Sequence, residues 1–134
     1  MQPAPRLYTL QEARNLLPTL IPILERLRQA QLELRAIEAA RTAAARSATA
    51  DGHDLAAPFP TQHTDPAAPL RHTIRTAHHQ LEALGIQLKD PARGLIDIPH
   101  RRNGQIVYLC YHLGEPTIAH WHHLDAGFAG RQPL

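Results

Sequence analysis

Gly94-Leu-Ile-Asp-Ile-Pro-His-Arg-Arg-Asn-Gly-Gln-Ile-Val-Tyr-Leu-Cys-Tyr-His112 is the stretch that decides the fold of the C-terminal half. Its two apolar-rich segments flank Asn103-Gly104, and both of these residues tolerate the positive φ of a type I′ turn. The stretch therefore predicts a β-hairpin whose register is set by the turn. The predicted partners are Ile96 with Tyr111, Asp97 with Cys110 and Ile98 with Leu109.

A third strand is predicted from Thr117 to about His122, after the turn Leu113-Gly-Glu-Pro116. An even-length loop would exchange the two faces of this strand, whereas a three-residue loop separates apolar from polar side chains much more cleanly. We favour the second, which predicts a three-stranded antiparallel meander within residues 94–134. Its apolar face holds Ile96, Ile98, Val107, Leu109, Tyr111, Ala119 and Trp121, and its polar face holds Asp97, Tyr108, Cys110, His112, Ile118, His120 and His122.

The N-terminal half shows the period of a helix instead. Thr9-Leu-Gln-Glu12 matches a capping box, in which each end residue accepts a hydrogen bond from the backbone N–H of the other. Apolar residues then recur in steps of three and four, which predicts a long helix over residues 8–46. Pro18 and Pro22 remove backbone donors, so we expect a kink or a restart there. The apolar seam comprises Leu10, Ala13, Leu17, Leu20, Leu24, Leu27 and Leu34.

Residues 47–69 contain four prolines and a glycine without periodicity, which predicts a flexible linker before a second helix over residues 70–85. Two helices with matching seams predict a long antiparallel helical hairpin. Together with the meander, this hairpin makes an α+β fold in a single domain of residues 1–134. The first seam is longer than the second, so we expect a homodimer in which a second copy covers the remainder through the helices.

The composition excludes several classes of protein. The chain has 134 residues, which suits one domain with a modest core. Cys110 is its only cysteine, which excludes an intramolecular disulfide and a multi-cysteine zinc module. The first residues lack the apolar core of a signal peptide, and no apolar run reaches the length of a membrane span. We therefore expect a cytoplasmic protein that does not enter a membrane.

Nucleic-acid binding would use Arg101-Arg102 at the hairpin tip and arginines of the first helix. The net charge of +2 at pH 7 is too small for the electrostatic footprint of such a protein. We interpret these arginines as a solvated turn and helix face. Weak nucleic-acid binding is kept only as a second alternative.

Distinctive short motifs stand in both halves of the chain: Tyr8-Thr-Leu-Gln-Glu-Ala13 with Leu17-Pro18, Gly85-Ile-Gln-Leu-Lys-Asp-Pro91, Gly94-Leu-Ile-Asp-Ile-Pro99, Val107-Tyr-Leu-Cys110 with Leu113-Gly-Glu115, Trp121-His122, and Gly127-Phe-Ala-Gly-Arg131. Together they resemble the bacterial family catalogued as Domain of Unknown Function 2203. The resemblance is close over residues 81–134 and weaker over residues 8–36. The family has no established activity, so the resemblance implies no reaction. It points to Glu115, Trp121, His122 and Arg131 as positions of interest.

Metal-donor side chains are concentrated on the polar face of the predicted meander. His120 and His122 lie about 6.5–7 Å apart by strand geometry. Imidazole, thiolate and carboxylate together suit a divalent transition metal such as zinc. The competing interpretation, which we favour, is that these donors merely share a face, because ten histidines scattered over the chain produce clusters by chance and no strict ligand motif is present. The candidate ligands are His120, His122, Glu115, Cys110, Asp97 and His112.

An enzyme would need a nucleophile beside a base. Cys110 and His120 resemble a thiol–imidazole dyad, but a mid-strand cysteine is commonly a packed hydrophobe, so no catalytic residue is assigned. We expect Trp121 to clamp the sheet to the helices and Arg131 to anchor the tail to a carboxylate. The sequence favours a self-associating helical interaction or scaffold module, with metal binding on the polar face as the alternative.

Overall fold

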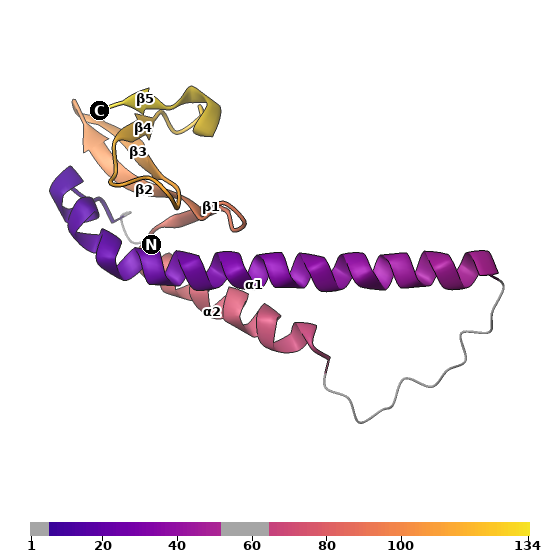
Figure 1. The fold of residues 1–134 in the computed structure, drawn as a ribbon. Coiled ribbons are helices and arrows are strands. Elements are labelled where there is room, and N and C mark those ends of the chain that lie inside the picture. Colours follow the sequence, from indigo (N-terminus) through magenta and orange to yellow (C-terminus); the bar gives the residue numbers. More distant parts are fainter. Residues whose placement is uncertain (1–5, 52–64) are drawn as a thin grey trace, which may run out of the picture.

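A computed structural model describes residues 6–51 and 65–134, and the fold is α+β, with two helices and a five-stranded antiparallel sheet (Figure 1). The sheet lies at one end of the long first helix. No helix within the described ranges is both long enough and apolar enough to cross a membrane. The helices are α1 (Leu10–Asp51) and α2 (Ala67–Ala83), and the strands are β1 (Gln87–Asp90), β2 (Leu95–Arg102), β3 (Gln105–Tyr111), β4 (His120–His122) and β5 (Gln132–Pro133), with the short 3₁₀ helix η1 (Phe128–Gly130) before β5.

α1 begins at the predicted capping box. Thr9 Oγ1 accepts from the Glu12 N–H at 3.0 Å, and the Thr9 N–H donates to Glu12 Oε1 at 2.8 Å. The helix then continues through Pro18 and Pro22 without a break. Figure 1 shows that the axis of α1 bends in this first part. The bend is expected because each proline removes a backbone donor and crowds the preceding turn, but the helix does not restart.

Both helices extend into the predicted linker. α1 runs past residue 46 because Ser47-Ala-Thr-Ala50 contains neither a glycine nor a proline to stop it. α2 begins at Ala67 rather than residue 70, and the Ala67 N–H donates to Asp65 Oδ1 at 3.0 Å. The linker predicted at residues 47–69 is therefore helical at both ends, which corrects that prediction. Its middle, residues 52–64, lies outside the described residues.

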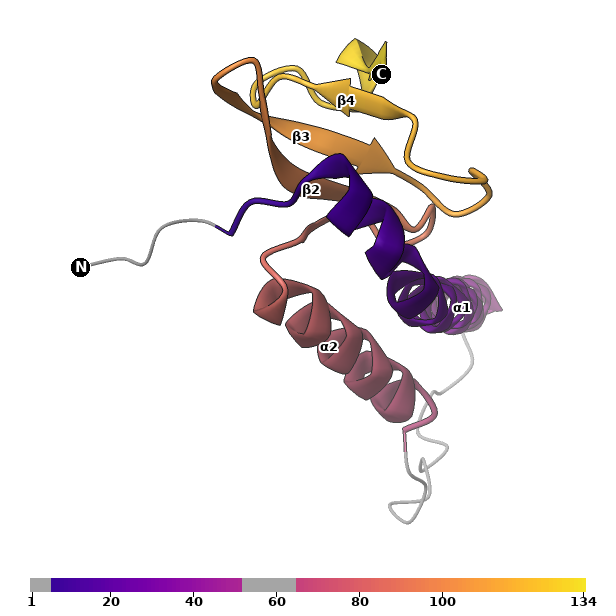
Figure 2. The same cartoon turned by 90° about the vertical axis from the view of Figure 1, so that its left-hand side faces the viewer.

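α2 packs beside α1 and runs in the opposite direction (Figures 1 and 2). Where α2 begins, Asp65 binds Arg41 of α1 and Arg71 of α2, and the Arg41 guanidinium contributes most to holding the pKa of the Asp65 carboxyl below its usual range. Beyond Leu34, no residue of α1 up to position 48 is buried. The large side chains of the seam are thus covered within one chain. The buried seam residues are Ala13, Leu17, Leu20, Leu24, Leu27 and Leu34.

The strand order β1-β2-β3-β4-β5 makes the sheet a continuous meander. Asn103 and Gly104 have φ values of 50° and 79°, as the predicted type I′ turn requires. The three predicted pairs of β2 and β3 are present, and Leu109 pairs with Trp121 as the three-residue loop requires. The sheet nevertheless has five strands rather than three. β1 has four residues, the shortest run in which alternation can indicate a strand, and β5 has two, which is too short.

The apolar face of the sheet packs on the helices (Figure 2), and its side chains share one core with those of α1 and α2. Tyr8 joins these layers, because its N–H donates to the Pro99 carbonyl oxygen at 2.8 Å and its hydroxyl donates to the Leu84 carbonyl oxygen. The two faces of the sheet therefore differ: one is closed by helices, and the other, the polar face, points away from them.

Ile118 departs from the predicted assignment of faces. It is fully buried in the core instead of lying on the polar face. The predicted third strand began at Thr117, but β4 contains only residues 120–122, so the alternation of a strand does not hold before it. Arg14 of α1 fixes the local path, because its Nε and Nη2 donate to the Ile118 carbonyl oxygen at 3.1 and 2.8 Å.

Candidate metal centre

Three of the predicted ligands converge on the polar face. Asp97 of β2, Cys110 of β3 and His122 of β4 each place one donor atom within 4.8 Å of the other two. These three side chains, called the trio below, belong to residues that are 2%, 0% and 1% exposed. Asp97 and Cys110 are register partners, and His122 pairs with Tyr108, so its ring reaches diagonally toward Asp97. The antiparallel sheet thereby gathers three chemically different donors from three adjacent strands.

The His122 ring is held at both nitrogens. Nε2 lies 2.9 Å from Asp97 Oδ1, and Nδ1 lies 2.7 Å from the His123 carbonyl oxygen. A carbonyl oxygen can only accept, so Nδ1 carries the hydrogen of its bond. This is the usual support for a metal-binding imidazole, because it fixes the ring and directs Nε2 at the other donors.

Cys110 is a buried thiol. Burial and the negative charge of Asp97 raise the pKa of this thiol to about 12, and the thiol is hydrogen bonded to Asp97. A thiol that stays protonated at neutral pH is not an activated nucleophile. A bound divalent metal would reverse this, because coordination deprotonates a thiol.

A second group of polar residues, called the outer cluster, consists of Glu115, His120 and Arg131. Arg131 donates to both carboxylate oxygens of Glu115, at 3.2 Å from Nη1 and 2.7 Å from Nη2, and its Nη2 also donates to His120 Nδ1. Burial alone would raise the pKa of Glu115, but the hydrogen bonds from Arg131 and from the His112 N–H outweigh it and lower that pKa. Arg131 thereby ties the C-terminal tail to a carboxylate, that of Glu115, whereas the sequence predicts a carboxylate partner without indicating which one.

The six predicted ligands therefore divide into two groups. Three form the trio, Glu115 and His120 belong to the outer cluster, and His112 lies at its edge with its N–H 3.0 Å from Glu115 Oε1. Cys110 and His120 are register partners, as the sequence predicts. His120 Nδ1 is bound to Arg131, and the described residues show no hydrogen bond between His120 and the thiol, so the structure does not support the thiol–imidazole dyad that the sequence pattern resembles.

The amino-acid sequence matches one protein family over nearly its whole length. A family described as an uncharacterized conserved protein, DUF2203, matches residues 6–134. The chain belongs to the DUF2203 family. The match covers α1, α2 and every strand, and thus both the trio and the outer cluster. Searches of curated proteins and of solved structures returned no match.

Trp121 packs in the hydrophobic core. It is one of the positions to which the resemblance to DUF2203 points. It is 9% exposed and belongs to the core, with the Arg102 guanidinium 4.8 Å from the ring centroid on its outer side. Further side chains make contacts that the sequence motifs do not predict. Gln87 Nε2 donates to the Tyr108 hydroxyl at 2.8 Å, which bridges β1 and β3 across β2. The Phe128 ring lies 4.2 Å from the Arg93 guanidinium.

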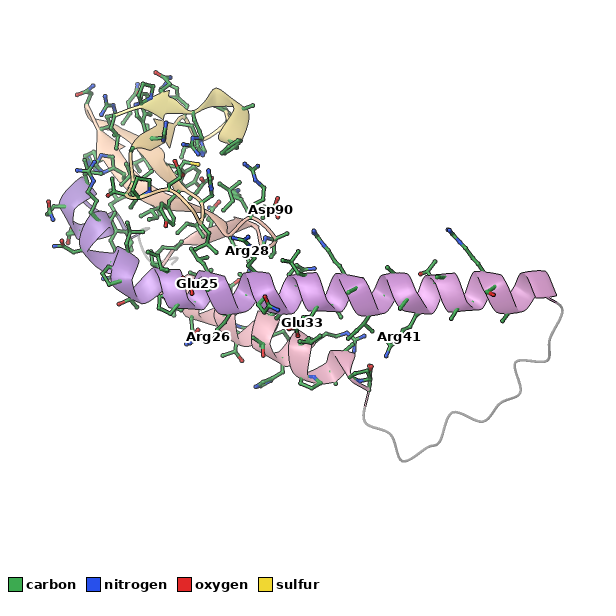
Figure 3. All side chains as sticks on the ribbon, viewed as in Figure 1. Glu25, Arg26, Arg28, Glu33, Arg41 and Asp90 are labelled. Atoms are coloured by element: carbon green, nitrogen blue, oxygen red, sulfur yellow. The ribbon has the colours of Figure 1, made fainter. Side chains whose placement is uncertain are left out.

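The helices of this DUF2203 chain also border a groove of about 490 Å³. Figure 3 labels three of its residues, Glu25, Arg26 and Glu33, on α1. The groove contains none of the six predicted ligands, so it does not extend the candidate centre. Its lining residues are Glu25, Arg26, Gln29, Ala30, Glu33, Leu70 and Thr73.

Proposed function

We propose that this protein binds one divalent transition metal, with zinc as the first candidate, through Asp97, Cys110 and His122. The single observation that supports this is the convergence of a carboxylate, a thiol and an imidazole within 4.8 Å in a buried site. Imidazole and thiolate suit zinc and its neighbours, whereas magnesium and calcium prefer oxygen donors alone. The chemistry of the donors therefore selects the class of metal.

Electrostatics favours a cation at this position. Burial, and after it the neighbouring Asp97 carboxylate, keep the proton on the Cys110 thiol, because a thiolate would place a second negative charge in this buried site. A divalent cation compensates both charges, and the Nδ1 hydrogen bond of His122 leaves Nε2 as the third donor. The trio needs no other protein donor to hold a metal, and a water would complete four-coordination.

The metal would fasten the sheet. Its three ligands belong to β2, β3 and β4, so binding would cross-link three adjacent strands that otherwise depend on backbone hydrogen bonds and on one packed face. A ligand that binds only the folded state stabilises it by mass action, by about 4 kcal/mol at a free concentration one thousand times Kd. We therefore assign the metal a stabilising effect on the sheet, and no catalytic step is attached to it.

The test is metal analysis of protein that is produced without an affinity tag. Elemental analysis should find about one zinc per chain, in line with one three-ligand site. Added zinc should raise the Tm of the chelator-treated wild type but not that of Cys110→Ser. Cobalt in place of zinc should give a thiolate-to-metal charge-transfer band that Cys110→Ser lacks.

Surface imidazoles supply the matched control. His78 and His79 on α2 both lie beside Glu82 and are exposed, so they can hold metal adventitiously. A variant with His78→Ala and His79→Ala should keep the metal and the Tm shift of the wild type. Protein that is purified without metal, and whose Tm does not respond to zinc or nickel, would refute the proposal.

We further propose a weak homodimer joined through α1. Leu32 on this helix is 44% exposed, and the end of α1 beyond it is rich in alanine, which lets a second helix approach closely. The association should be weak because the buried seam is already covered within one chain. Light scattering should show a mass that rises with concentration, and Leu32→Glu should abolish the rise. A constant monomer mass would refute this.

A further inference from the structure

We propose that residues 123–134, called the strap below, gate access to the trio, and that the ion pair of Arg131 with Glu115 is the latch that keeps the strap closed. This inference rests on the proposed metal function for the identity of what enters. The gating itself concerns only the burial of Cys110, and it can be measured on the protein without any metal.

The trio can be reached only from the polar face, because helices cover the opposite face of the sheet. Strap residues lie against this face. Arg131 contacts His120, which is the register partner of Cys110, and its charge acts on the Cys110 thiol. Phe128 extends the cover, since its ring centroid is 6.1 Å from that of His112 at the end of β3.

Polar contacts, rather than apolar burial, hold the strap in place. Its large apolar side chains remain substantially exposed: Leu124 is 54%, Phe128 is 37% and Leu134 is 39% exposed. β5 adds only two residue pairs at the edge of the sheet. The Arg131–Glu115 pair, by contrast, has both side chains only 12% exposed. A segment with little apolar burial is the kind that opens locally without global unfolding.

The competing hypothesis is that the trio is reached from the β1 side of the same face. The hydrogen bond from Gln87 to Tyr108 passes over β2, beside Asp97, which is the register partner of Gln87. If the trio were reached from this side, loss of that bond would expose the thiol and the latch would not matter. The two entrances therefore predict different sensitive residues.

The experiment uses Cys110 as its own reporter, because it is the only cysteine of the chain. The rate of alkylation of the full-length, metal-free protein by iodoacetamide is followed by mass spectrometry in native buffer. Arg131→Gln should accelerate the reaction about tenfold or more, because labelling of a buried thiol follows the population of the open form. Arg101→Gln at the exposed hairpin tip and Tyr108→Phe should each stay within about twofold of the wild type, since neither touches the latch.

Removal of either side of the ion pair removes the latch. Glu115→Gln should also accelerate labelling. Low concentrations of urea should hardly change the rate in Arg131→Gln, because local opening exposes little surface.

The proposal is overturned if Arg131→Gln labels no faster than the wild type, if Tyr108→Phe accelerates labelling as much, or if the rate rises steeply with urea. A final arm adds zinc. Protection of the thiol by zinc, together with acceleration by Arg131→Gln in its absence, supports both proposals. Acceleration without zinc protection supports the strap and refutes the metal.

Discussion

Replacement of Asp97 tests whether the trio is an organised hydrogen-bonded site. In the metal-free protein, Asp97 receives the His122 Nε2 contact at 2.9 Å and is hydrogen bonded to Cys110, with its side chain only 3% exposed. Asp97→Ala leaves the Cys110 thiol and the His122 Nε2 atom buried without the partner that Asp97 provides. Breaking a buried pair by removing one member costs about 3–5 kcal/mol, a large share of the roughly 5–15 kcal/mol that stabilises a domain.

Asp97→Asn is the matched control for this prediction. The amide can donate to His122 Nε2 while Nδ1 keeps its bond to the His123 carbonyl, and the amide oxygen can accept from the thiol. Its cost should therefore stay below about 1 kcal/mol. The two variants separate the hydrogen bonds of residue 97 from its ability to bind a metal, because asparagine preserves the hydrogen bonds but is a poor metal ligand. Zinc should raise the stability of the wild type and of neither variant.

The assay is urea denaturation at pH 7 with a chelator present, followed by Trp121 fluorescence. Trp121 lies in β4 next to His122, so its emission reports the strands that carry the trio. The free energy of unfolding should fall by about 2–4 kcal/mol more in Asp97→Ala than in Asp97→Asn. Equal losses in the two variants would show that the hydrogen bonds of Asp97 do not stabilise the sheet and that the trio is not an organised hydrogen-bonded site.

Three other variants test separate parts of the fold. Thr9→Ala removes the capping box of α1 and should cost about 1 kcal/mol in urea denaturation, while an unchanged midpoint would show that the box is unimportant. Gly94→Ala should cost about 2–4 kcal/mol of unfolding free energy, because φ is +60° and a Cβ would meet Leu113 Cγ at 2.5 Å. Gly104 has φ +79° but open space around it, so Gly104→Ala should cost only the backbone strain of about 1–2 kcal/mol. The lowered pKa of Glu115 means that its latch stabilises the fold above the usual carboxyl pKa of about 4.3 and is lost as pH falls through the folded value. Wild type should therefore lose more stability than Glu115→Gln between pH 6 and pH 3, and parallel pH profiles would contradict this.

Features that depend on neighbours in sequence could be predicted. The capping box needs only Thr9 and Glu12, and the β2–β3 hairpin needs only Asn103 and Gly104, so both are formed as expected. The register of β2 with β3 then follows from the turn, and the apolar face follows from the register. β1 and β5 have no such local signal. They become strands because they pair with the exposed edges of β2 and β4.

The sequence predicts the face of the sheet on which the candidate site lies, but not which side chains on that face meet. Strand alternation places His120 and His122 on the same side, but it cannot say which imidazole reaches Asp97. That outcome is decided by Arg131, which holds His120, and by the His123 carbonyl, which orients His122. Side-chain rotation and a contact with the C-terminal tail thus separate two histidines that are equivalent in the sequence pattern.

The long exposed end of α1 has a consequence for how this protein unfolds. Between residues 35 and 47 only Ile37 is even half-buried, so about 20 Å of helix is surrounded largely by water. Such a segment owes its helicity to the propensity of alanine rather than to packing. Heating should fray it gradually while the core stays intact, and circular dichroism will decline before the tryptophan signal changes. If the transitions seen by circular dichroism and by tryptophan fluorescence do not coincide, the cause would be fraying of this exposed helical end. The rest of the protein would still unfold cooperatively, without a folding intermediate.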